Sequence, residues 1–196
     1  ALKAMWEKGR IEIPFYTADG ATPYMLEAGS LPGCAIGLDP GSNEKHFAEA
    51  EKLGRNVPVF CSELYPGWLT HWGEPWARAK TEEVIKDLEW LLANKKSFNL
   101  YVFHGGTNWG FWAGANMGDA YQPDVTSYDY DAPLDEQGRP TAKYHALRDL
   151  IAASLGSGDP LPPVPDPIRS MAIPEFAMTA HASIWSHLPP AIPLVQ

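Results

Sequence analysis

The sequence has 196 residues, of which 45% are hydrophobic and 20% are charged, and this composition excludes a disordered or fibrous protein. Its formal net charge of -9, without a long cluster of lysine and arginine, argues against nucleic acid or an anionic membrane as the main partner. A neutral substrate fits this charge better. There is no run of about 18 apolar residues, the length that would predict a membrane-spanning helix.

Four short apolar segments end in polar or glycine-rich loops, and we expect each of them to form a β-strand. They are residues 11–17, 34–38, 57–62 and 98–103. Helical patterns separate them, and this alternation is typical of parallel βαβ units. The sequence therefore predicts an α/β fold built on a parallel sheet.

The helices between these strands are predicted from apolar residues that recur at spacings of three and four. Residues 44–53, 80–93 and 141–155 show this pattern, and residues 21–31 form a weaker candidate for a short helix. Acidic residues open segment 80–93, where the helix dipole favours them. Gly156 is a typical C-terminal stop for the last helix. All of these helices would cover a face of the sheet.

The composition changes after Gly156, where prolines follow one another closely. Proline cannot continue a helix, so we expect residues 157–169 to be an extended, proline-rich linker. Residues 170–196 would begin a following β-rich region, with one candidate strand pair near residues 175–178 and 182–185.

Aromatic side chains are concentrated in residues 65–76 and 109–112, and the chain has eight tryptophans. Flat rings of this kind suit the C–H faces of sugars, although packing in the core accounts equally well for about half of them. The two cysteines, Cys34 and Cys61, are too few for a disulfide framework or a zinc site. We expect them to be buried free thiols.

Glu63 follows the third predicted strand at its C-terminal end and precedes a loop rich in aromatic residues. In α/β barrels the C-terminal ends of the strands and the loops after them form the active site. Strict alternation would send Val59, Cys61 and Glu63 to the same side, so Glu63 would lie at the mouth of a barrel if that side faced its interior. The alternative is a solvated loop residue or a salt-bridge partner.

Three ordered motifs resemble glycoside hydrolase family 35, the β-galactosidases. Residues 62–73 resemble the nucleophile motif of that family, residues 98–110 resemble its eighth barrel strand and loop, and residues 126–134 resemble the segment that closes its pocket. The resemblance implies a (β/α)8 TIM-barrel type fold of which this chain supplies strands five to eight. Residues 1–156 would then be the C-terminal half of the catalytic barrel.

The resemblance also implies the chemistry and the residues that perform it. Glu63 would be the nucleophile of a retaining hydrolase that removes terminal non-reducing β-D-galactose by double displacement. Tyr65, Tyr101 and Tyr130 would bind the substrate, although a packed core position is an alternative for Tyr101. The mechanism needs no metal and no organic cofactor.

The general acid of the family lies in an Asn-Glu pair at the end of the fourth barrel strand. The only Asn-Glu pair here, Asn43-Glu44, opens a predicted helix and does not match. We therefore expect the acid upstream of residue 1. Asp19 and Asp39 end the first two predicted strands, where a pocket role and a capping or turn role are equally open. His71 and His104 are either pocket or structural residues.

Two further hypotheses follow from the sequence. The chain alone would be a catalytically incomplete half-barrel that only binds sugar or a partner chain, because a half-barrel leaves open sheet edges. Its partner would then be the missing N-terminal half or a second copy through self-association. A different β-glycoside as substrate is the other hypothesis. The resemblance is compatible with an extracellular, periplasmic or lysosomal-type compartment, which the residues themselves do not specify.

Overall fold

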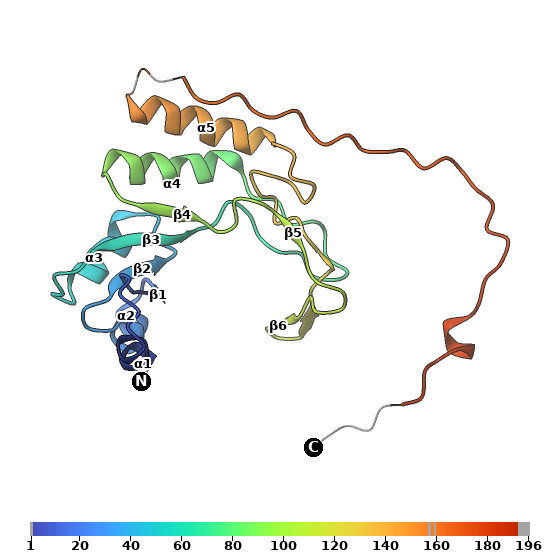
Figure 1. Ribbon diagram of the computed structural model, residues 1–196, viewed down its shortest axis with the longest axis horizontal. Coiled ribbons are helices and arrows are strands. Elements are labelled where there is room, and N and C mark those ends of the chain that lie inside the picture. The colour runs from blue at the N-terminus through green and yellow to red at the C-terminus, as the bar shows by residue number, and fades with distance from the viewer. Residues whose placement is uncertain (1, 157, 159, 192–196) are drawn as a thin grey trace.

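The computed structural model describes residues 2–156, 158 and 160–191. An α/β region occupies the first part of the chain, and a long extended segment runs away from it after the last α-helix (Figure 1). The described part of the chain contains an open sheet and no closed barrel.

Four parallel strands form the central sheet in the order β1-β2-β3-β4. Their bounds are Tyr16–Gly20, Ala35–Asp39, Val59–Leu64 and Phe98–Leu100. This confirms the predicted parallel α/β arrangement. Strand β1 begins later than predicted because the Ile11 N–H bonds the Trp6 carbonyl in the turn after the first helix, and Pro14 has no N–H to donate to a ladder.

The predicted helices are also present, with one more at the start of the chain. They are α1 (Leu2–Lys8), α2 (Pro23–Gly29), α3 (Glu44–Glu51), α4 (Thr81–Ala93) and α5 (Ala142–Leu155). Side chains at the N-caps accept backbone N–H bonds from the first turn, as Asn43 does for α3 and Thr141 for α5. Gly156 ends α5 in the left-handed conformation with φ of 58°.

The hydrophobic core lies between the sheet and its helices. Leu88 and Leu91 of α4 are fully buried there, and so is Cys61 of β3, while Val59 packs against the same cluster. The expectation that Val59, Cys61 and Glu63 lie on the same side of the strand was therefore wrong, because Glu63 lies outside this core. Cys34 and Cys61 are buried free thiols as predicted, and burial raises the pKa of Cys61 to about 11.

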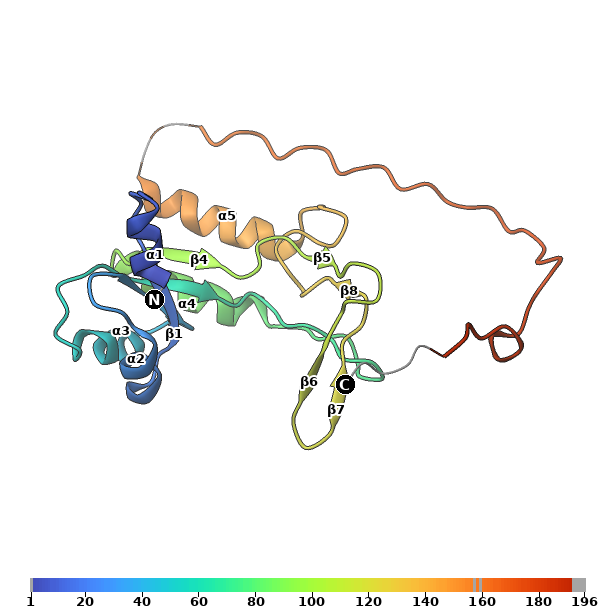
Figure 2. The same cartoon turned by 60° about the horizontal axis from the view of Figure 1, so that its bottom comes forward.

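The loops after β4 form two small antiparallel pairs. Strand β5 (Gly106–Thr107) pairs with β8 (Ser127–Tyr128), and β6 (Ala115–Met117) pairs with β7 (Tyr121–Pro123). The β6–β7 hairpin projects away from the main sheet (Figure 2). The pairing of β5 with β8 fixes the segment that carries Tyr128 and Tyr130 beside the sheet.

Beyond Gly156 the described residues contain no strand, and their one regular element is the 3-10 helix η1 (Ile184–Ser186). The predicted strand pair near residues 175–178 and 182–185 was wrong for this part of the chain. This segment meets no sheet edge that could take up its backbone groups, and Trp185 is 80% exposed. Residues 160–169 of the proline-rich stretch are extended, as expected (Figure 1). The domain boundaries at 156 and 169 remain predictions.

Candidate active site

A bulge in β3 explains why Glu63 does not follow the alternation of its strand. Cys61 pairs with Phe98 and Leu64 pairs with Leu100, so a step of three residues on β3 faces a step of two on β4. Cys61 and Leu64 are both buried, although strict alternation would place them on opposite faces. The extra residue lies between them. Bulges next to active sites commonly redirect a side chain, and here Glu63 is half-buried outside the apolar core.

The hydroxyl of one tyrosine contacts the carboxylates of both Glu63 and Asp39. The hydroxyl of Tyr65 lies 2.8 Å from Oε2 of Glu63, and the same hydroxyl contacts Oδ1 of Asp39. Asp39 is the last residue of β2 and Tyr65 directly follows β3. Burial and the contacts with Asp39 and Glu63 raise the pKa of Tyr65. The C-terminal ends of neighbouring strands therefore bring both carboxylates together.

The three tyrosines singled out in the sequence form one cluster with Glu63. The ring centroid of Tyr101 lies 6.0 Å from that of Tyr65 and 5.9 Å from that of Tyr130, both in edge-to-face geometry. Tyr130 is only 3% exposed, whereas Tyr101 is 39% exposed and is therefore not a core residue. Burial, followed by the neighbouring tyrosines and Glu63, raises the pKa of Tyr130.

Two further aromatic residues of this cluster were not predicted as site residues. Tyr128 stacks on Tyr130 with a centroid distance of 5.1 Å, and Trp68 packs against both Tyr65 and Tyr130. Burial is the main cause that raises the pKa of Tyr128, and the neighbouring Tyr101 raises it further. The alternation of Tyr128, Asp129 and Tyr130 was the available signal, because it places both tyrosines on one side of an extended segment.

Lys143 of α5 ties together the two loops that carry these tyrosines. Its side chain is 5% exposed, and its ammonium donates to the carbonyls of Pro66 and Asp131 at 2.5 and 2.7 Å and to Oδ2 of Asp131 at 2.8 Å. An ammonium has three donors, and all three are used. Pro66 directly follows Tyr65, and Asp131 directly follows Tyr130. Lys143 therefore holds the backbone beside both residues.

The tyrosine loops also approach each other more closely than a side chain would allow. A Cβ atom on Gly67 would lie 1.7 Å from the carbonyl oxygen of Tyr130. Tyr130 and Asp131 themselves have positive φ angles of 61° and 50°, a conformation that costs a non-glycine residue about 1 to 3 kcal/mol unless its surroundings impose it. The contact at Gly67 and the bonds from Lys143 are those surroundings.

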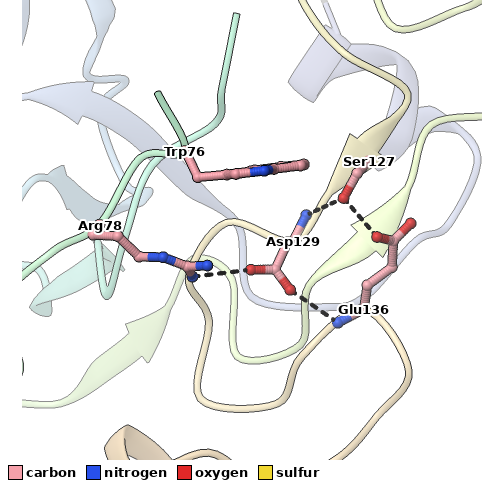
Figure 3. Close-up of a pocket in the computed structure, with 5 residues that line it drawn as sticks. All are labelled: Trp76, Arg78, Ser127, Asp129 and Glu136. Atoms are coloured by element: carbon pink, nitrogen blue, oxygen red, sulfur yellow. Dashed lines mark hydrogen bonds and ion pairs between the residues drawn. The ribbon is translucent and has the colours of Figure 1, made fainter. Parts of the chain in front are cut away.

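A second polar network supports the back of this segment, where Ser127, Asp129 and Asp131 alternate with the tyrosines. A cavity of about 200 Å³ is lined there by Trp76, Arg78, Ser127, Asp129 and Glu136 (Figure 3). Arg78 lies 2.8 Å from Asp131 and 3.4 Å from Asp129. Burial opposes ionisation of Asp131, but hydrogen bonds from Lys143, the Ala79 N–H and Arg78 lower its pKa. None of the residues that line this cavity belongs to the Glu63 cluster.

The remaining polar candidates lie outside the Glu63 cluster. Asp19 accepts a hydrogen bond from the Ser30 hydroxyl at 3.3 Å. His71 contacts Glu74 and Asn116, each at 2.9 Å, and so links the loop after β3 to the β6–β7 hairpin. His104 forms an isolated bridge with Leu134. Asp39 is the candidate that joins the site.

The described residues contain no group of three or more His, Cys, Asp or Glu side chains arranged to hold a metal ion. Within the same part of the chain, every helix is too short or too polar to cross a membrane.

Comparison of the amino-acid sequence with known proteins places the chain in a family. Residues 2–154 match the model of glycosyl hydrolases family 35. The chain is 38% identical to a β-galactosidase of Xanthomonas manihotis over 97% of its own length and 32% of that protein. It is 47% and 45% identical to β-galactosidases of Macaca fascicularis and Homo sapiens, in each case over 71% of the chain and 21% of the relative. The chain thus spans about a third or less of these relatives, and it belongs to glycosyl hydrolase family 35.

Proposed function

We propose that this chain carries the nucleophile of a retaining β-galactosidase and that Glu63 is that nucleophile. The observation that carries the proposal is the position of Glu63 near the C-terminal end of β3, where it is bonded to Tyr65. The ring of Tyr65 packs against Tyr101, which in turn packs against Tyr130. Active sites of α/β barrels are built at this end of the strands. The names of the relatives support the choice of galactose.

In the proposed reaction an oxygen of Glu63 attacks the anomeric carbon of a terminal β-galactoside. The bond from that carbon to the leaving oxygen breaks, and a general acid protonates the leaving oxygen. Water then cleaves the galactosyl ester, so the anomeric configuration is retained. Tyr65, Tyr101 and Tyr130 hold the sugar hydroxyls and orient the glutamate.

The general acid is proposed to come from a part of the barrel outside the described residues, with β1 to β4 corresponding to barrel strands five to eight. Asn43-Glu44 supports this assignment, because Asn43 caps α3 by accepting the His46 N–H and the pair does not end a strand. In retaining enzymes the two carboxyl groups are about 5 Å apart.

An assay needs a complete barrel, and we call the assembly that provides it the complemented enzyme. It consists of this chain together with barrel strands one to four from the Xanthomonas manihotis relative. Glu63→Gln should abolish hydrolysis of a nitrophenyl β-galactoside by the complemented enzyme, because an amide cannot form the glycosyl ester. Glu83→Gln is the matched control, since that side chain is 74% exposed on α4 and should keep normal activity.

Glu63→Ala gives a sharper result, because azide can enter the space that the side chain vacates. An azide ion attacking from the nucleophile's side should yield α-galactosyl azide. Formation of β-galactosyl azide would contradict the nucleophile assignment. Normal hydrolysis of the galactoside by Glu63→Ala, without any azide product, would contradict it as well. A panel of other nitrophenyl β-glycosides tests the sugar, and equal rates with glucosides would reject galactose specificity.

The alternative is that the chain alone is a catalytically incomplete half-barrel that binds sugar or a partner chain. The open sheet favours it, because Tyr16 of the edge strand β1 is 60% exposed, with its ring edge-on to that of Phe60. Sedimentation of the isolated chain, combined with the galactosidase assay, distinguishes the two cases. A monomer with ordinary turnover would reject the half-barrel hypothesis.

A further inference from the structure

The hydroxyl of Tyr65 has one hydrogen but contacts two carboxylates. Its oxygen lies 2.8 Å from Oε2 of Glu63 and also contacts Oδ1 of Asp39. A phenol donates one hydrogen bond at a time. Glu63 and Asp39 therefore compete for the same hydrogen, and its position decides which of the two carboxylates the hydrogen bond stabilises.

The fold fixes all three groups independently of the sugar. Asp39 pairs with Gly20 at the end of the β1–β2 ladder, so its backbone is held by the sheet. Tyr65 is held from the other side by Trp68 and by the bond from Lys143 to the next residue, Pro66. The hydrogen of Tyr65 can therefore change acceptor by rotation of the hydroxyl alone, without movement of the backbone.

The two acceptors change in relative strength during the proposed reaction. In the free enzyme Glu63 must be ionised to act as nucleophile, and a hydrogen bond to the ionised form stabilises it. In the galactosyl ester the same oxygens carry no full charge and accept hydrogen bonds more weakly. Asp39 then becomes the better acceptor for Tyr65.

We propose that Asp39 is a positioning residue that takes over the hydrogen bond of Tyr65 when Glu63 becomes esterified to the sugar. The inference rests on the proposed role of Glu63 as nucleophile. The bond between Glu63 and the anomeric carbon forms and the bond to the leaving oxygen breaks, with the general acid supplying the proton to that oxygen. Tyr65 keeps its own hydrogen throughout, and no oxidation or reduction takes place.

Other ionisable groups around this site include three phenols, the carboxylates of Asp124 and Asp131, and the Lys143 ammonium, which bonds the Pro66 carbonyl and Asp131. Tyr101, Tyr128 and Tyr130 interact electrostatically with one another or with Glu63, and Asp124 acts on Tyr128. Among these groups, Asp39 and Glu63 are the two that contact the Tyr65 hydroxyl. The exchange of acceptors is therefore assigned to this pair.

A double-mutant cycle in the complemented enzyme tests whether Asp39 acts through Tyr65. Asp39→Asn should slow formation of the galactosyl enzyme from a 2-deoxy-2-fluoro galactoside by about tenfold, because a neutral amide oxygen is a weaker acceptor for the Tyr65 hydroxyl than a carboxylate. The same change should speed reactivation of the trapped enzyme, because the hydrogen bond that stabilises the intermediate is weakened. In a Tyr65→Phe background, Asp39→Asn should change neither rate.

Opposite changes in the two rates cannot arise from a general loss of structure. Asp19→Asn is the matched control, because Asp19 lies at the end of the neighbouring strand β1 and bonds Ser30 instead of the tyrosine cluster. An equal effect of Asp39→Asn with and without the Tyr65 hydroxyl would overturn the inference. Rescue of Asp39→Asn by azide to give β-galactosyl azide would also overturn it, since it would make Asp39 the general acid.

The two proposals fail in distinguishable ways. If the fluoro sugar labels a residue other than Glu63, the proposed function is wrong. If it labels Glu63 but the effect of Asp39→Asn persists without the Tyr65 hydroxyl, only the role of Asp39 is wrong.

Discussion

Removal of the Lys143 ammonium is expected to destabilise the protein more than any surface change. Lys143→Met keeps the length and the apolar stem of the side chain but deletes all three of its hydrogen bonds. Two main-chain carbonyls, those of Pro66 and Asp131, then lose a donor in a site that is nearly closed to solvent. The carboxylate of Asp131 keeps Arg78 as its remaining cationic partner.

The size of the effect follows from these contacts. Breaking a buried charge pair by removing one partner costs about 3 to 5 kcal/mol, because the other charge stays buried. Arg78 is 62% exposed and still neutralises part of the charge on Asp131, so we expect the lower end, about 3 kcal/mol. The activity should also fall, since Lys143 holds the backbone beside Tyr65 and Tyr130.

Urea unfolding of the complemented enzyme, followed by circular dichroism and by residual activity, measures this loss. Lys80→Met is the matched control, because the Lys80 side chain is 78% exposed and its pair with Glu83 is fully on the surface. The control should change stability by less than about 0.5 kcal/mol. A loss below about 1 kcal/mol for Lys143→Met would refute the role assigned to the buried ammonium.

Three other changes test the site and its surroundings. Tyr130→Phe should lower kcat/KM without changing the circular dichroism spectrum, because it removes one buried hydroxyl worth about 1 to 3 kcal/mol, and full activity would make Tyr130 a packing residue. Gly67→Ala should reduce activity and lower the unfolding midpoint, since its Cβ would overlap the Tyr130 carbonyl; an unchanged midpoint and unchanged rates would reject that close approach. The hydrogen bonds of His71 with Asn116 and Glu74 raise the pKa of its imidazole. The stability that His71 contributes should therefore be complete below the unfolded pKa of about 6.5, and it should disappear as the pH rises through the higher pKa of the folded protein. The unfolding temperature of His71→Gln should lack this pH dependence, and parallel curves for both proteins would contradict it.

The sequence was sufficient to predict the regular elements of the α/β region. Helices α4 and α5 follow the three-and-four spacing of their apolar residues, and the caps at Asn43 and Thr141 mark helix starts. The apolar residues at this spacing face the core, as the buried side chains of Leu88 and Leu147 show. Local periodicity is a reliable signal wherever one face of an element packs and the other meets water.

Features that depend on pairing between distant residues could not be predicted in this way. The bulge in β3 is visible only in its register against β4, so strict alternation wrongly placed Glu63 on the same side as Cys61. Lys143 reads as an ordinary polar residue of a helix, and its burial depends on Pro66 and Asp131, far away in the sequence. The strand pair predicted in the tail failed because β-propensity without a partner strand does not make a sheet.

The candidate site was predicted in its residue types but not in its connections. Glu63, Tyr65, Tyr101 and Tyr130 lie together as a single cluster, while their catalytic and binding roles remain proposals. Asp39 was left open between a pocket role and a turn role. The three-dimensional contact through Tyr65 distinguishes it from Asp19, which lies one residue before the end of the neighbouring strand, pairs with Leu38 and bonds Ser30.

The identity of the nucleophile is tested most directly by covalent trapping. The complemented enzyme is incubated with a 2-deoxy-2-fluoro galactoside that carries a good leaving group, digested with protease and sequenced by mass spectrometry. The account predicts one galactosyl label, on Glu63, and loss of that label when the natural substrate is present in excess. A label on Asp39, Asp129 or any other carboxylate would contradict it.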